Sequence, residues 1–174
     1  MTTPETTAPE FSRLVDPRHA DGRRVVLEPT DRERAALARR FGLVAIERLA
    51  AEALLTGRGA VIEVQGTLRA DIVQSCAVSA EDLAVAIEEP LTFRFVPARA
   101  DHPPDEEIEL DAEACDEIEY AGTSFDLGEA IAQSLGLAID PFAIGPAAEE
   151  ARRAGWLGES GEGPFAVLAK LRKD

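Results

Sequence analysis

The strongest structural signal in this sequence lies in residues 60–95, which read AVIEVQGTLRADIVQSCAVSAEDLAVAIEEPLTFRF. In its first half, small or apolar residues occupy most even positions and polar residues most odd ones: Ile62, Val64, Gly66, Leu68, Ala70, Ile72, Cys76 and Val78 against Glu63, Gln65, Thr67, Arg69, Asp71 and Ser75. Successive side chains of a strand point to opposite faces, so this pattern predicts a long strand with one buried face. We expect Gly66 to mark a bulge or bend in that strand.

A second alternating run follows in the same stretch, formed by Leu83, Val85, Ile87, Leu91, Phe93 and Phe95. Between the two runs, residues 79–82 read SAED, which suits a hairpin turn. The stretch therefore predicts two long antiparallel strands joined by a short turn, and this hairpin is expected to lie at the centre of the fold.

The residues before this hairpin predict shorter elements. Residues 1–10, rich in Thr, Pro and Ala, are expected to form a flexible tail. Residues 11–15 and 23–28 are interpreted as two strands. Thr30 with Glu33 three positions later fits a capping box and predicts a helix over residues 32–41 that stops at Gly42. The side chains that this helix is expected to bury are Ala36, Leu37 and Phe41.

The residues after the hairpin predict one further strand and a longer helix. Residues 116–120 are interpreted as the strand, and Asp126 is expected to cap a helix that runs to about residue 138. That helix is expected to bury Leu127, Ile131, Leu135 and Leu137, with Gly128 as an early weak point. Beyond it, we expect a break at residues 140–146, helical turns at 149–156, a flexible spacer at 158–163 and a short helix at 164–171.

The net charge of −15 is large for 174 residues and unevenly distributed. Residues 1–60 hold ten Lys or Arg and nine Asp or Glu, whereas residues 101–119 hold ten acidic residues and no Lys or Arg. Such a field repels phosphate backbones at long range. Residues 97–114 are interpreted as a solvated acidic loop, because they combine many carboxylates with several prolines.

Three stretches in this order and spacing resemble the bacterial YceD family, the large ribosomal RNA subunit accumulation proteins. They are VQGTLRADIVQSCAVSAEDLAVAIEEPLTFRF (64–95), DEIEYAGTSFDLGEAIAQSLGLAIDPF (116–142) and GPFAVLAKL (163–171), and they cover about half of the chain. The resemblance implies a role in the accumulation or maturation of large-subunit ribosomal RNA. In many bacteria the gene of this family lies beside that of a large-subunit ribosomal protein.

The family has no agreed reaction, so the resemblance implies no catalytic residue. Many members carry Cys-x-x-Cys at the hairpin and further cysteines near the C-terminus, which suggests metal binding. In this sequence Cys76 is present but Ser79 takes the place of the second cysteine, and the C-terminal tail has none. We therefore expect no metal site and no cofactor here.

Residues 44–56, VAIERLAAEALLT, fit two structures. Their Ala, Leu and Glu content favours a helix by intrinsic propensity. However, Leu49, Ala51, Ala53 and Leu55 alternate as they would in a strand. We favour the strand, chiefly because of the family resemblance.

The possible catalytic residues have simpler structural interpretations. Cys76 lies on the apolar side of the long predicted strand and is expected to be a buried thiol that behaves as a small apolar side chain. Cys115 has acidic neighbours, which would raise the pKa of a thiol and disfavour a nucleophilic thiolate. His19 and His102 stand in Pro- and Asp-bearing loops with no nucleophile motif nearby. The sequence therefore predicts no enzymatic activity and no small-molecule substrate.

Two charged sets remain as candidate interaction surfaces. The acidic set is either a solvated loop or an anionic surface for a basic partner, and comprises Asp105, Glu106, Glu107, Glu109 and Asp111. The basic set either balances local carboxylates or contacts RNA, and its leading members are Arg23, Arg24, Arg39 and Arg40.

Together these features predict one α+β domain over residues 11–174. It would contain a twisted, largely antiparallel sheet, partly barrel-like, with a long central hairpin and two or three helices. The expected function is a non-enzymatic factor for large-subunit rRNA, acting through a ribosomal protein or an rRNA-processing factor; the alternative is a module that binds RNA directly through the N-terminal arginines. With no signal-peptide pattern and no long apolar run, the cytoplasm is expected and a membrane is not.

Overall fold

The computed structural model describes residues 9–98 and 116–154. They divide into a larger unit, residues 9–74, 84–98 and 116–139, and a smaller one, residues 75–83 and 140–154. In chain order the elements are β1 (Leu14–Val15), η1 (Pro17–His19), β2 (Arg23–Leu27), α1 (Asp31–Phe41), β3 (Ala45–Arg58), β4 (Val61–Ser75), β5 (Asp82–Pro97), β6 (Glu117–Tyr120), β7 (Phe125–Asp126), α2 (Leu127–Ala138) and α3 (Pro146–Arg153). None of the helices in these ranges has the length and apolar character needed to cross a bilayer.

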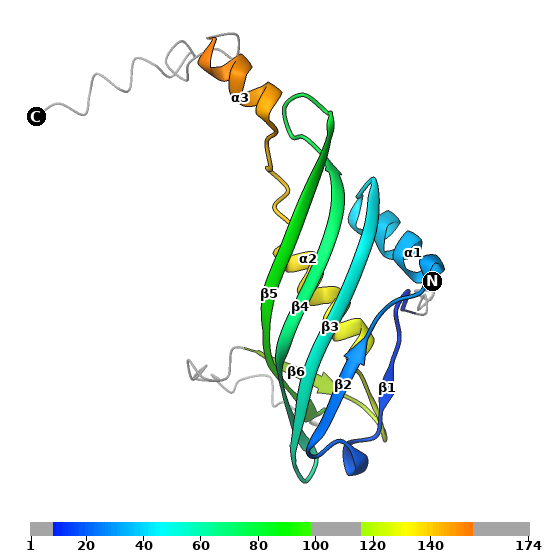
Figure 1. Cartoon of the computed structure of the whole chain (residues 1–174). Coiled ribbons are helices and arrows are strands. Elements are labelled where there is room, and N and C mark those ends of the chain that lie inside the picture. The colour runs from blue at the N-terminus through cyan, green and yellow to red at the C-terminus, as the bar shows by residue number, and fades with distance from the viewer. Residues whose placement is uncertain (1–8, 99–115, 155–174) are drawn as a thin grey trace, which may run out of the picture. The chain divides into compact units, whose positions relative to one another are not determined.

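The larger unit is built on a five-stranded sheet in the order β2-β3-β4-β5-β6 (Figure 1). β3 is antiparallel to both β2 and β4, whereas the short β6 runs parallel to β5. β4 and β5, with 15 and 16 residues, form the long hairpin. The α+β class and the central hairpin are therefore confirmed. The sheet is open, because β2 and β6 pair with no further strand in the described residues, so the expected curl towards a barrel does not reach closure.

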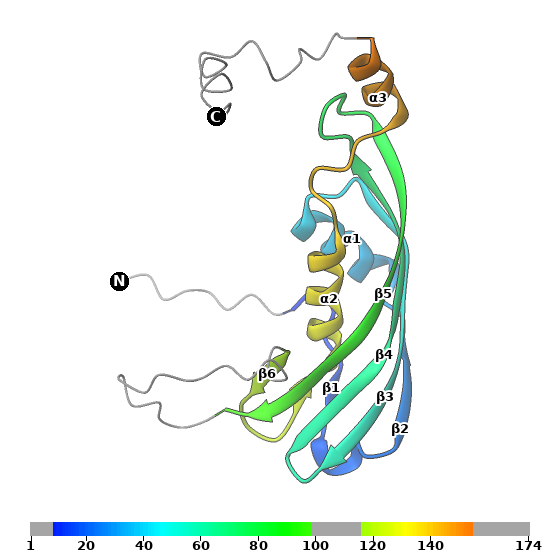
Figure 2. The same ribbon diagram turned by 90° about the vertical axis from the view of Figure 1, so that its left-hand side faces the viewer.

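The apolar face of the sheet carries the core, and α1 and α2 lie on that side (Figure 2). Its buried side chains alternate along the three long strands: Leu49, Ala51, Ala53 and Leu55 in β3; Ile62, Val64, Leu68, Ala70 and Ile72 in β4; Ile87, Leu91, Phe93 and Phe95 in β5. The strand prediction for residues 44–56 is thus confirmed. Pairing on both sides and burial of alternate residues outweigh the helix propensity of this segment.

Gly66 differs from its predicted role. It pairs in register with Ala53, and the only irregularity described in the β3–β4 ladder lies between Ile46 and Arg48. A Cβ on Gly66 would overlap the carbonyl oxygen of Glu52. Glycine is therefore needed here because the two strands approach closely, not because the chain bulges.

The hairpin turn also begins earlier than predicted. β4 ends at Ser75, so residues 76–81 form the turn and Val78, expected on the buried face, is 43% exposed. Alternation continued in the sequence beyond the strand because the turn contains small and apolar residues. Its backbone closes through Cys76 N–H to Glu81 O, at 2.8 Å.

Helix α1 begins and ends as the sequence predicts. The Thr30 hydroxyl accepts a hydrogen bond from Glu33 N–H, and the Glu33 carboxylate accepts one from Thr30 N–H at 2.7 Å. Gly42 ends the helix in the left-handed conformation with φ +66°, which glycine adopts without strain. Leu37 is fully buried, whereas Ala36 and Phe41 are only partly buried.

Helix α2 starts at the predicted cap but exposes one residue expected in the core. Asp126 accepts from Glu129 N–H at 3.1 Å, and Leu127, Ile131 and Leu135 are fully buried. Leu137, in contrast, is 89% exposed. It lies one residue before the end of α2, on the same side of the helix as the buried Ala130, so its exposure reflects its place at the helix end, where no described residue covers it.

Gly128 is a requirement of the packing rather than a flaw in the helix. A Cβ on it would lie 2.6 Å from the carbonyl oxygen of Phe11 and 2.8 Å from Arg13 N. The N-terminal segment thus passes directly over the first turn of α2. It pairs there as β1 with β7, through Leu14↔Asp126 and Val15↔Phe125.

The predicted strand over residues 11–15 is therefore shorter than expected, since only Leu14–Val15 forms a ladder. Phe11 lies outside it but is fully buried. In the smaller unit, Ala77 N–H donates to Ala143 O at 3.0 Å, and α3 starts at Pro146, three residues before the predicted helical turns. The predicted spacer at 158–163 and the helix at 164–171 lie outside the described residues.

Candidate functional site

The four arginines of the candidate RNA surface are distributed over two elements. Arg23 and Arg24 lie in β2, and Arg39 and Arg40 in the last turn of α1. Arg23 pairs with the buried Leu55 across the ladder and Arg24 with the partly exposed Leu54. Cross-strand partners share a face, so these two neighbouring arginines project to opposite faces of the sheet.

Arg40 is held by two carboxylates. Its guanidinium donates to Glu129 at 2.8 and 2.9 Å and to Glu10 at 3.0 Å. These bonds link the N-terminal segment, α1 and α2, and the bond from Arg40 lowers the pKa of Glu129. Arg40 therefore acts as a structural cation in the described residues.

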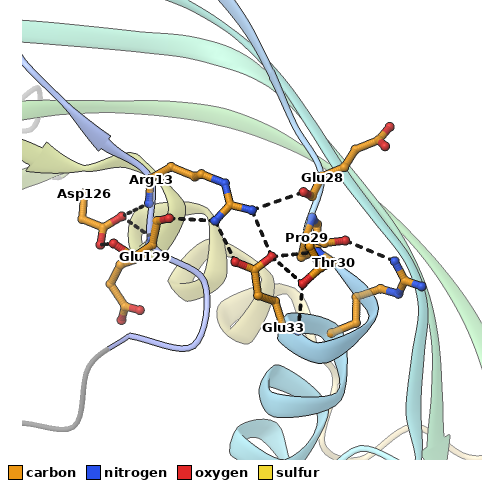
Figure 3. A network of polar contacts seen from close by, with 9 residues as sticks. Arg13, Glu28, Pro29, Thr30, Glu33, Asp126 and Glu129 are labelled. Carbon is orange, nitrogen blue, oxygen red and sulfur yellow. Dashed lines mark hydrogen bonds and ion pairs between the residues drawn. The ribbon is translucent and has the colours of Figure 1, made fainter.

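A second polar cluster surrounds Arg13 (Figure 3). Arg13 donates two parallel bonds to the Glu33 carboxylate, at 2.7 and 2.9 Å, and a third to the carbonyl of Ser12. Asp126 accepts from the Ser12 hydroxyl and from Arg13 N–H, at 2.5 and 2.7 Å, besides capping α2. The segment that contains Ser12 and Arg13 is thereby joined to the first turn of α1, through Glu33, and to the start of α2, through Asp126.

This cluster is suited to holding the fold together and poorly suited to proton transfer. The hydrogen bonds from Arg13 lower the pKa of Glu33 to about 2. A general acid or base works best when its pKa lies near the operating pH. Near neutral pH, which is far above its pKa, Glu33 stays ionised and does not exchange a proton readily. The sequence revealed only the local half, the Thr30–Glu33 box, because Arg13 lies 20 positions away from Glu33.

Cys76 occupies the hairpin turn of the smaller unit. Its sulfur accepts hydrogen bonds from Gly145 N–H at 3.3 Å and Ser79 N–H at 3.4 Å. These donors, led by Gly145, lower the pKa of the thiol to about 6, although burial of a side chain that is 4% exposed acts in the opposite direction. The thiol is buried as predicted, but the lowered pKa was not anticipated because Gly145 is 69 positions away.

The described residues contain no metal-binding group of acidic, His or Cys side chains. In residues 9–98 and 116–154, no three His, Cys, Asp or Glu side chains are placed to share a metal ion. His19 ends the short helix η1, 3.6 Å from the carboxylate of Asp16. His102, Cys115 and the candidate acidic surface (Asp105, Glu106, Glu107, Glu109 and Asp111) lie outside the described residues.

Two open grooves flank the sheet of the larger unit. One, about 650 Å³, lies between β1 and β2 and is lined in part by Arg23, Arg24 and Val26. The other, about 420 Å³, lies between β5, β6 and α2. The charged residues that line this second groove are Glu89, Asp116 and Glu117. Both grooves are open to solvent, unlike the enclosed pockets that bury most of a small ligand.

Comparison with known protein families gives a match. The family model described as "Large ribosomal RNA subunit accumulation protein YceD" matches residues 64–172, more than half of the chain. The match begins in β4 and covers the hairpin, α2 and α3. No curated protein and no solved structure matches this chain.

Proposed function

Since this chain belongs to the YceD family of large ribosomal RNA subunit accumulation proteins, we propose that it is a non-enzymatic ribosome-biogenesis factor that supports large-subunit rRNA through protein partners. The family match over residues 64–172 carries this proposal. The partner would be a ribosomal protein or an rRNA-processing factor. Its place of action would be the cytoplasm, where ribosomal subunits mature.

The charge supports a route through proteins rather than through bare RNA. A net charge of −15 opposes approach to a phosphate backbone and favours basic partners, among which proteins that themselves bind RNA are prominent. Two of the described cations, Arg13 and Arg40, add little to a nucleic-acid surface because they are bound to carboxylates.

The absence of an enzymatic role is part of the same proposal. Glu33, whose carboxylate accepts two hydrogen bonds from Arg13, is kept ionised by that cation. Cys76 is ionisable near neutral pH but only 4% exposed. A nucleophile needs access to its substrate as well as a low pKa, so this thiol is poorly placed for catalysis.

The alternative is direct RNA binding through the N-terminal arginines. Arg23 and Arg24 favour it, because both are exposed and line the β1–β2 groove. They point to opposite faces, however, and single-stranded RNA is usually gripped by cations combined with stacked aromatic side chains. No aromatic residue lines that groove in the described part of the chain.

The two routes are distinguished by affinity capture of the tagged full chain from a lysate of its native organism, with and without RNase. We expect a ribosomal protein or an rRNA-processing factor to remain bound after RNase. Loss of every ribosomal component on RNase treatment, together with tight, salt-sensitive binding of the purified chain to rRNA, would overturn the proposal and favour direct RNA binding.

A further inference from the structure

We propose that the groove between β5, β6 and α2 binds an extended, Lys- and Arg-rich segment of a protein partner. This inference rests on the proposed function and deepens it, because it assigns the protein contact to one surface and gives the chemistry of the occupant. The groove holds about 420 Å³ and combines an open strand edge, an exposed apolar anchor and a rim of carboxylates.

In the described residues, no strand pairs with the part of β5 that precedes the β6 ladder, so its edge is open there. β6 pairs only with Arg94–Pro97, and the backbone N–H groups of Arg94 and Ala98 donate to Asp116 O and Tyr120 O. By the two-residue period of a strand, the N–H of Thr92 faces the same edge. No described strand lies there, so a segment placed ahead of β6 could pair with this part of β5.

The apolar anchor is Leu137. It is 89% exposed although it follows α2 residues that are fully buried, and it lines the groove together with the floor residues Leu91 and Phe93. A single exposed leucine is ordinary on a protein surface. Beside an open strand edge, it can cover one apolar side chain of a segment lying in the groove.

The rim is acidic and its charge is not balanced. All three charged lining residues are carboxylates, and no Lys or Arg lines the groove in the described residues. Glu117 is paired with Arg94 at 2.8 Å. Glu89 and Asp116 have no ion pair within the described chain. Cations on an incoming segment would therefore meet two unpaired carboxylates.

The same features disfavour other occupants. A phosphate backbone would be repelled by the rim, and so would a second copy of this strongly acidic chain. Pro90 lacks an N–H, and Glu89 sits at a position of β5 that otherwise points towards the core face. Proline and inward-pointing charge on an edge are devices that prevent strands from pairing with identical strands. A basic segment avoids the charge penalty because its cations compensate Glu89, and it pairs with β5 beyond Pro90, at Thr92.

The test places a photo-crosslinking amino acid at position 137 of the full chain, expressed in its native organism, and sequences the crosslinked peptides by mass spectrometry. The matched control carries it at Leu54, which is 38% exposed in β3 and lines none of the described grooves. We expect a Lys- and Arg-rich protein segment to crosslink at 137 about tenfold more than at 54.

Charge reversal completes the test. Glu89→Lys is expected to reduce the crosslink at 137 by about tenfold, and Glu63→Lys, an equal change at an exposed position of β4 away from the groove, to leave it unchanged. Crosslinks to RNA, to a second copy or to an acidic segment overturn the inference, as does insensitivity to Glu89→Lys in a variant that melts like the parent.

The two proposals can fail separately. If position 137 captures nothing while the tagged chain still retains ribosomal proteins after RNase, the groove assignment is wrong and the proposed function stands. If a basic segment of a protein unrelated to ribosomes crosslinks there, the groove stands and the proposed function is wrong.

Discussion

At the scale of single residues, Glu33 combines a local role in the capping box of α1 with an ion pair to Arg13, which lies 20 positions away. Glu33 closes the capping box of α1 and also receives two bonds from Arg13. Its side chain is 21% exposed, so the pair is partly screened by solvent. For such a pair, a contribution of up to about 1 kcal/mol to the free energy of unfolding is reasonable.

Replacing Glu33 with Gln is expected to remove this ion pair while keeping a residue type that can still close the capping box. Because folding lowers the pKa of Glu33 from 4.5 to about 2, its stabilisation is complete above pH 4.5 and is lost as the pH falls towards 2. Glu33→Gln should therefore be less stable than the parent by up to about 1 kcal/mol at pH 7 and equally stable near pH 2. Urea unfolding at a series of pH values measures this.

The control for Glu33→Gln is Asp31→Asn in the same helical turn, where the Asp31 side chain is 97% exposed. It should show a smaller difference at pH 7. A stability difference for Glu33→Gln that does not change between pH 7 and pH 2 would contradict the assigned role of the ion pair.

Cys76 gives a second residue-scale prediction. In a Cys115→Ser variant, which leaves one thiol, thiolate absorbance in the ultraviolet is expected to rise with a midpoint near pH 6, because Gly145 N–H and Ser79 donate to the sulfur. The same chain in denaturant should titrate near pH 8.5, the ordinary value of a free thiol. A folded-state midpoint at or above that of the denatured chain would show that burial outweighs the donors.

At the scale of elements, two glycines allow close packing of α2: Gly128 against the N-terminal segment and Gly136 against Phe41 of α1. Ala normally stabilises a helix interior by about 1 kcal/mol over Gly. At Gly128 a Cβ would meet backbone atoms, Phe11 O at 2.6 Å and Arg13 N at 2.8 Å. At Gly136 the nearest atom, at 2.9 Å, belongs to the ring of Phe41, which can shift.

Gly128→Ala is accordingly expected to lower the free energy of unfolding by about 2 kcal/mol or more, since the backbone contacts outweigh helix propensity. Gly136→Ala in the same helix should be close to neutral. Thermal and urea unfolding of both variants provide the comparison. Equal stabilisation by the two substitutions would mean that the N-terminal segment does not lie against α2 as described.

Most elements could be predicted because each one leaves a local pattern. Alternation located β4 and most of β5, and Thr30–Glu33 and Gly42 marked both ends of α1. The predictions failed where the outcome depended on residues that are distant in the sequence. Nothing within a few residues of Gly66 reveals the carbonyl of Glu52, and nothing near Leu137 shows that the end of α2 is uncovered in the described residues.

At the scale of the whole molecule, the proposed function predicts that the free arginines of β2 are dispensable. In cells that lack the native gene, the Arg23→Glu, Arg24→Glu double variant should restore the ratio of large- to small-subunit rRNA as fully as the parent chain does. Both positions are exposed and carry no described ion pair, so the fold should tolerate the change. Quantifying the two rRNAs measures the effect.

The comparison variant reverses two exposed arginines elsewhere, Arg48→Glu with Arg69→Glu in β3 and β4, and it also breaks their ion pairs with Asp71 and Glu88. If only the β2 pair abolishes rRNA accumulation, direct RNA binding through the N-terminal arginines becomes the better account. If neither pair matters, the route through protein partners is supported.

The sequence by itself determined most of the helices and strands, the α+β class and the family resemblance that the match over residues 64–172 confirms. These rest on periodicity, caps and composition, which act over a few residues. Only the tertiary structure decided which groups meet: Arg13 with Glu33, Ser12 with Asp126, and Gly145 with Cys76. It also decided that the described sheet ends at β2 and β6, because the edges left unpaired depend on how distant strands are brought together.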